Sequence, residues 1–80
     1  MARVLGALRE QMMDGYTLMS RTELNEDELV KVLSKLKSMD VVSIRGDVNE
    51  ESVGRAHVWI LPSNRGKAES LFSSLTSSAY

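Results

Sequence analysis

The chain has 80 residues, of which 42% are hydrophobic and 26% are charged, and this composition is that of one small globular domain. Ten basic and eleven acidic residues give a formal net charge of −1, so an anionic partner would have to be held by local rather than by global charge. Cysteine is absent and histidine occurs once, which excludes disulfides and leaves secretion and a tetrahedral zinc site without support.

The N-terminal part of the chain predicts two helices. Over residues 2–13 the apolar positions fall on one helical stripe, which consists of Val4, Leu5, Leu8 and Met12. Asp14-Gly15 should end this helix, because glycine readily adopts the left-handed conformation found at helix ends. A second, short helix is expected over residues 17–23.

The third helix, over residues 25–39, has the clearest signals. Asn25 can cap its first turn and Glu28 can reach back as the partner in a capping box. The predicted buried stripe consists of Leu29, Val32, Leu33, Leu36 and Met39. The residues expected to face outward are Asp27, Lys31, Ser34 and Ser38, with an ion pair between Asp27 and Lys31.

The C-terminal half predicts a β-hairpin and a last helix. Residues 41–45 are rich in β-branched side chains, residues 46–54 form a polar loop, and residues 55–61 alternate as an antiparallel second strand. In that strand Ala56, Val58 and Ile60 should face the core, with Arg55, His57 and Trp59 on the other side. Pro62 ends the strand. Ser63 or Asn64 can then cap a helix whose apolar stripe is Ala68, Leu71, Phe72 and Leu75.

The order and spacing of these elements resemble a winged helix-turn-helix domain of small prokaryotic regulators such as the MarR and PadR families. Leu24 falls in the predicted turn, and the helix after it repeats apolar residues at Leu29, Leu33 and Leu36. The segment from Leu61 to Leu71 is similar to the strand end and final helix after the wing in those families. The resemblance implies an α+β fold with three helices, a β-hairpin wing and a C-terminal helix. Residues 1–76 would be one domain, and residues 77–80 a frayed tail.

The function that the resemblance implies is that of a cytoplasmic, homodimeric transcriptional regulator that binds double-stranded DNA without a cofactor. Its third helix would enter the major groove, with Lys31 and Ser34 near the base edges. The other expected DNA contacts are Ser38 on the same face, Lys35 and Lys37 at its flanks, and Arg45 and Arg55 on either side of the wing. The structural alternative is a solvated helix face and cross-strand ion pairs.

Two departures from the regulator pattern qualify this function. Asp40 stands where those families usually place glycine, although aspartate tolerates the left-handed conformation. The presumed wing carries only acidic charges, Asp47, Glu50 and Glu51, and the third helix also begins with three carboxylates. The alternative function is therefore a winged-helix protein–protein interaction module or a subunit of a larger assembly. A continuous cationic patch would favour DNA, and dispersed cations with an exposed apolar patch near Trp59 would favour a protein partner.

An enzyme is not expected, and no catalytic residue, metal ligand or cofactor-binding residue is predicted. His57 has no predicted nucleophile and acid in reach, and the sequence contains neither a Gly-x-Ser-x-Gly elbow nor a glycine-rich phosphate loop. No apolar run approaches the roughly 18 residues of a membrane span. The large ring of Trp59 should be covered by a terminal helix or form part of a partner surface. The methionines should fill gaps in the core. The functional alternative is a dimer interface built from the first and last helices.

Overall fold

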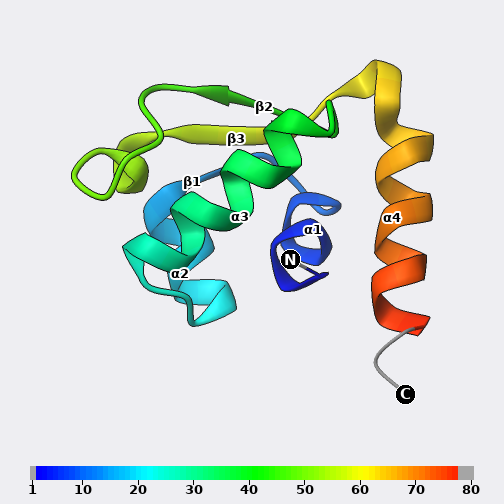
Figure 1. The fold of residues 1–80 in the computed structure, drawn as a ribbon, viewed down its shortest axis with the longest axis horizontal. Helices are drawn as coiled ribbons and strands as arrows, with labels where there is room; N and C mark the ends of the chain where they lie inside the picture. The colour runs from blue at the N-terminus through cyan, green and yellow to red at the C-terminus, as the bar shows by residue number, and fades with distance from the viewer. Residues whose placement is uncertain (1, 78–80) are drawn as a thin grey trace.

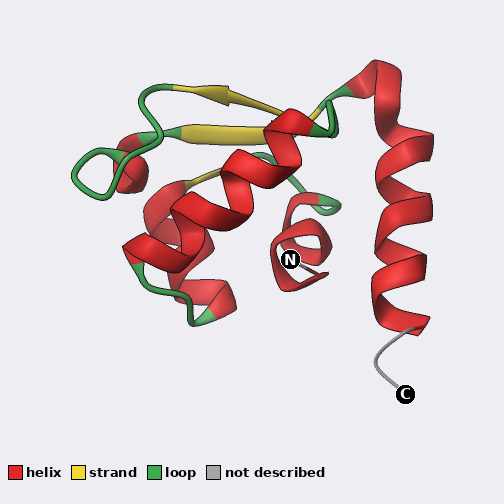
Figure 2. Ribbon diagram, in the orientation of Figure 1, coloured by secondary structure: helices red, strands yellow, loops and turns green. Residues whose placement is uncertain are grey.

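The computed structural model describes residues 2–77 and shows an α+β arrangement of helices around a small antiparallel sheet (Figures 1 and 2). The four helices are α1 (Ala2–Leu8), α2 (Gly15–Thr22), α3 (Glu26–Ser38) and α4 (Arg65–Ser77). The strands are β1 (Met13–Asp14), β2 (Val42–Arg45) and β3 (His57–Ile60), and two short 3₁₀ helices are η1 (Val53–Arg55) and η2 (Pro62–Asn64). Residues 78–80 of the predicted tail lie outside the described part.

The sheet has the strand order β1-β3-β2, and both strand pairs are antiparallel. One face is buried: Met13, Val42, Val58 and Ile60 belong to the core. Figure 1 shows α3 lying across the sheet and α4 standing beside α1. From α3 the core receives Leu29, Leu33 and Leu36, each with no exposed surface. The other two residues of the predicted stripe, Val32 and Met39, are half-buried against it. The opposite face of the sheet, here called the free face, carries Ser43, Arg45, His57 and Trp59.

Side-chain caps explain where α2 and α3 begin. The Asp14 carboxylate accepts a hydrogen bond from the Thr17 backbone N–H at 2.8 Å. Asn25 accepts from the Glu28 backbone N–H at 2.9 Å, and Glu28 accepts from the Asn25 N–H at 3.4 Å, which confirms the predicted capping box. After α3, Asp40 adopts a left-handed φ of +58°, in agreement with its expected tolerance of that conformation.

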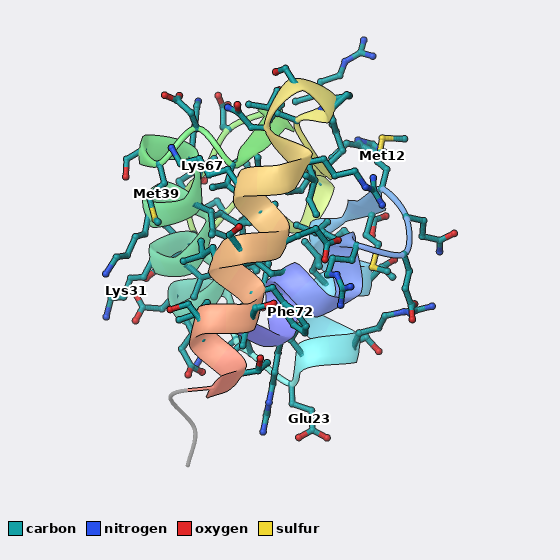
Figure 3. All side chains as sticks on the ribbon, turned by 90° about the vertical axis from the view of Figure 1, so that its right-hand side faces the viewer. Met12, Glu23, Lys31, Met39, Lys67 and Phe72 are labelled. Carbon is teal, nitrogen blue, oxygen red and sulfur yellow. The ribbon has the colours of Figure 1, made fainter. Side chains whose placement is uncertain are left out.

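Helix α4 packs against α1 through one side. Ala68 is buried, while Leu71, Phe72 and Leu75 are half-buried against the core, so the predicted stripe is confirmed. Arg9 joins the two helices: its guanidinium lies 4.5 Å from the centre of the Phe72 ring and 2.9 Å from the Glu69 carboxylate. Figure 3 shows Phe72 between α4 and α1.

The N-terminal helix prediction is wrong beyond Leu8. Met13 and Asp14 form a strand because they pair with Val58 and His57 of β3, which places the Met13 side chain in the core. Met12 therefore leaves the predicted buried stripe and is 59% exposed. The Asp14-Gly15 pair begins α2 instead of ending α1.

The segments on either side of the second hairpin strand add detail that the sequence did not predict. The second hairpin strand begins at His57 because residues 53–55 form η1, which packs against α2 and α3. Asn64 directly precedes α4, and both it and Ser63 belong to η2, which runs straight into that helix. The Asn64 side chain donates a hydrogen bond to the Asp40 carbonyl oxygen at 2.6 Å and ties this turn to the end of α3.

Candidate functional site

The outward face of α3 is as the sequence predicted. Lys31, Ser34, Lys35 and Ser38 are exposed, and Lys37 is exposed beside them. Lys31 is paired with Asp27, with its Nζ 3.2 Å from the carboxylate. The Ser38 hydroxyl donates to the Lys35 carbonyl oxygen at 2.7 Å. The face is thus polar and accessible, and only part of its charge is free.

The beginning of α3 and the loop before η1 bring acidic side chains together. The hydrogen bond from Lys31 lowers the pKa of the Asp27 carboxyl, and the Glu50 carboxyl lies close to that of Asp27. Glu26, Glu28 and Glu51 are exposed in the same two segments. This end of α3 is negatively charged.

Six of the ten basic residues are held by contacts within the molecule. Ion pairs hold three of them, as Arg9–Glu69, Arg21–Glu10 and Lys31–Asp27. The other three, Arg3, Arg65 and Lys67, donate to backbone carbonyl oxygens. Among the described residues, the cations without a hydrogen bond or ion pair are Lys35, Lys37, Arg45 and Arg55, all of which belong to the predicted DNA contacts.

These four free cations are spread over three elements. Lys35 and Lys37 lie in the last turns of α3, Arg55 lies in η1, and Arg45 ends β2. Figure 1 shows that β2 begins near the C-terminal end of α3 and runs away from it toward the loop before η1. Arg45 also pairs in register with His57, whose side chain is on the free face of the sheet, away from α3. The structure therefore does not bring the predicted set together.

The free face of the sheet contains a groove of about 820 Å³. It is lined by Met12, Arg45, His57 and Trp59, of which Trp59 is half-buried. None of these lining residues belongs to α1 or α4, and α4 packs against α1. Figure 3 shows Met12 on one side of the molecule and Lys31 on the other, so the groove and the outward face of α3 point in different directions. Arg45 and Trp59 were singled out from the sequence, but Met12 was assigned to a helix core.

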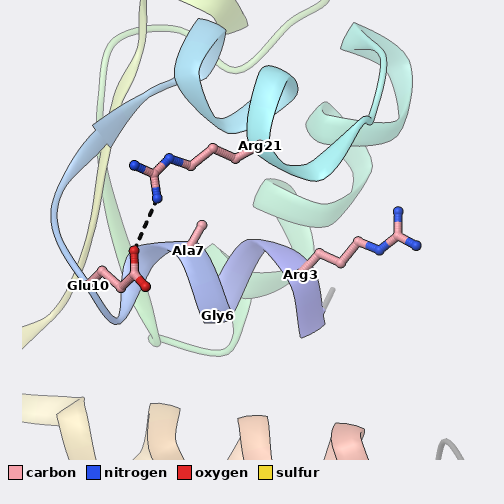
Figure 4. Close-up of a pocket in the computed structure, with 5 residues that line it drawn as sticks. All are labelled: Arg3, Gly6, Ala7, Glu10 and Arg21. Carbon is pink, nitrogen blue, oxygen red and sulfur yellow. Dashed lines mark hydrogen bonds and ion pairs between the residues drawn. The ribbon is translucent and has the colours of Figure 1, made fainter.

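A second, smaller hollow of about 430 Å³ lies between α1 and α2 (Figure 4). Its lining is Arg3, Gly6, Ala7, Glu10 and Arg21. Arg21 reaches across it to Glu10, with a nitrogen–oxygen distance of 3.1 Å. Because its charged groups satisfy one another or the backbone, it presents less free binding capacity than the groove on the sheet.

Comparison of the chain with protein-family models, with curated proteins and with solved structures gave no match. Within residues 2–77, His, Asp and Glu side chains form no group that could hold a metal ion. The described helices include none that combines the length and apolarity needed to cross a bilayer.

Proposed function

We propose that this chain is a winged-helix domain that acts as a protein-interaction module, and that its binding surface is the groove on the free face of the sheet. The winged-helix assignment is supported by the order of elements, in which α2 and α3 are joined by a tight turn and followed by the hairpin β2-β3. It is also supported by β1, which adds a third strand to the hairpin from the N-terminal half of the chain.

One observation carries the proposed function. Arg45, a free cation, lies with Trp59 and the exposed Met12 in one groove on the free face of the sheet. Aromatic residues, methionine and arginine are the residue types enriched in the centres of protein interfaces. The polar groups of His57 and Arg45 beside them can orient a partner while the apolar side chains supply contact area.

The charge of α3 argues against DNA as the main partner. In helix-turn-helix proteins the N-terminal residues of the recognition helix approach the bases, and here these residues are Glu26 and Asp27, with Glu50 next to them. Carboxylates near phosphates repel them, and Arg45 faces away from this surface. The cations that remain on α3 are too few for strong binding, because affinity for DNA rises with the number of phosphates neutralised.

The proposal is tested by selecting binders from a displayed random peptide library against the full chain. We expect enriched peptides whose binding is lost in Trp59→Ala and Met12→Ala and kept in Lys35→Ala, the matched change of an exposed residue outside the groove. Circular dichroism would show that each variant is folded. If the selection enriched no peptide whose binding depends on the groove, the proposed function would be contradicted.

DNA binding remains the second candidate, and Lys35 and Lys37 favour it, because both are exposed and unpaired at the basic end of α3. It is tested by fluorescence anisotropy with duplex DNA at low and moderate salt. The interaction-module proposal expects no salt-sensitive binding. Binding that weakens with salt would instead favour the regulator. If Lys35→Ala also reduced the slope of log K against log salt concentration by about one unit, a phosphate contact of Lys35 would be established.

A further inference from the structure

The side chains on the free face of the sheet form two short rows. The first row consists of Met12, Trp59 and Ser43. Trp59 is paired with Ser43 of β2. Met12 precedes Met13, the partner of Val58, so continuing the antiparallel register places Met12 beside Trp59. In the second row Asp14 and Arg45 flank His57 as its two register partners. The rows are two residues apart along the strands, which corresponds to about 7 Å. One row is apolar and the other is ionic.

The free charge of the ionic row is at its β2 end. Asp14 is already engaged, because its carboxylate accepts the capping hydrogen bond from Thr17. Arg45 is exposed and has no hydrogen bond or ion pair with any described residue. A guanidinium can donate two parallel hydrogen bonds to one carboxylate. The complementary group at this position is therefore an Asp or Glu side chain.

Strand β2 is an edge of the sheet, since the strand order is β1-β3-β2. The Leu61 N–H donates to the Val41 carbonyl oxygen, which makes that residue pair a hydrogen-bonded one. Pairs alternate in antiparallel sheets, so Ser43 and Arg45 also bond to β3, while the backbone groups of Val42 and Ile44 point to the open edge. An extended peptide can bind such groups by adding a strand.

Resting on the proposed function, we propose that the partner is an extended acidic segment that adds as a strand along β2. It would carry an acidic side chain opposite Arg45 and a large apolar side chain two residues away, opposite Ser43. Side chains at this spacing lie on the same face of a strand, about 7 Å apart, as the two rows require. The small side chain of Ser43 leaves room for the apolar group to lean over it toward Trp59.

Trp59 is the only tryptophan of the chain, so its fluorescence reports binding in the groove directly. The probe is a short capped peptide in which Glu and Leu stand two residues apart, separated and flanked by Thr. We expect a saturable change of Trp59 emission that weakens with salt. We also expect about tenfold weaker binding in Arg45→Ala, because a charge-assisted hydrogen bond is lost, and unchanged binding in Lys35→Ala.

Two further measurements separate strand addition from other modes of binding. Arg45→Glu should lose the Glu peptide and gain the same peptide with Lys in place of Glu. A Glu peptide methylated at the backbone nitrogens that face β2 should not bind. This proposal would be overturned if the Glu peptide did not bind at all. It would also be overturned if the methylated peptide bound, or if substitution of Arg45 left binding unchanged. The proposed function would still stand if the display selection yields other peptides that depend on the groove.

Discussion

Gly15, the first residue of α2, packs directly against the backbone of Val53 in η1. A Cβ atom built on Gly15 would overlap the Val53 carbonyl group and approach the Gly54 Cα to 2.8 Å. The Gly15 N–H donates to the Ala56 carbonyl oxygen at 2.9 Å, so backbone meets backbone on both sides of this contact. The junction holds the end of the hairpin against the N-terminal half of the chain.

We predict that Gly15→Ala destabilises the protein by at least the roughly 1–3 kcal/mol typical of overpacked sites, because neither backbone can move without breaking the strand pairing. The matched control is Gly66→Ala in α4, where a Cβ would meet nothing within 4 Å. That change should stabilise the protein by up to about 1 kcal/mol through helix propensity. Urea unfolding of the two variants measures both, and equal effects would show that the junction tolerates a side chain.

Leu33 is central to the buried stripe of α3 and has no exposed surface. Leu33→Ala should lower the free energy of unfolding by about 2–5 kcal/mol, because it removes buried methyl groups and leaves a cavity. Ser34→Ala, on the exposed side of the same helix, should change it by less than about 0.5 kcal/mol. Denaturant titrations measure both changes. If Leu33→Ala lowered the free energy of unfolding as little as Ser34→Ala, Leu33 would not be on the core-facing side of α3.

Asp14 should contribute a pH-dependent part of the stability. Its hydrogen bonds from Thr17 lower the pKa of the carboxyl, and the charge of His57 acts in the same direction. Because the folded pKa is below the usual value of about 3.9, this contribution is fully present above that value. It is lost as the pH falls through the folded pKa.

Asp14→Ala should therefore cost about 1 kcal/mol at neutral pH, and its deficit should shrink in acid. Asp14→Asn keeps a capping oxygen without a titratable group, so it should be nearly as stable as the original protein at neutral pH. Unfolding measured from neutral to acidic pH distinguishes the two. A deficit of Asp14→Ala that stays constant over this range would mean that charge plays no part in the cap.

Glu23 ends α2 with a left-handed φ of +60°, a conformation that costs a residue with a side chain about 1–2 kcal/mol relative to glycine. Glu23→Gly should consequently raise the midpoint of thermal unfolding. Glu26→Gly is the control of opposite sign, because Glu26 is exposed and helical and glycine lowers helix propensity there. A fall in the midpoint for Glu23→Gly would indicate that the Glu23 side chain makes a compensating contribution.

The sequence was sufficient for the elements whose signals are local. The capping box of Asn25 and Glu28, the stripe of α3 and the left-handed Asp40 each depend on residues within a few positions of one another. The alternation at Ala56, Val58 and Ile60 likewise followed from period-two burial, and all three are buried. For these elements the intrinsic conformational preferences and the packing in the core favour the same structure.

Only the tertiary structure decided what residues 9–15 do and where the free charges lie. Met13 and Asp14 become a strand because β3, far away in the chain, offers the hydrogen bonds, and no local pattern contains that partner. The same pairing turns Met12 outward beside Trp59. Arg45 and Lys35 are close in sequence but face different sides, because a strand register and a helix phase set their directions independently. The groove therefore could not be predicted from the sequence alone.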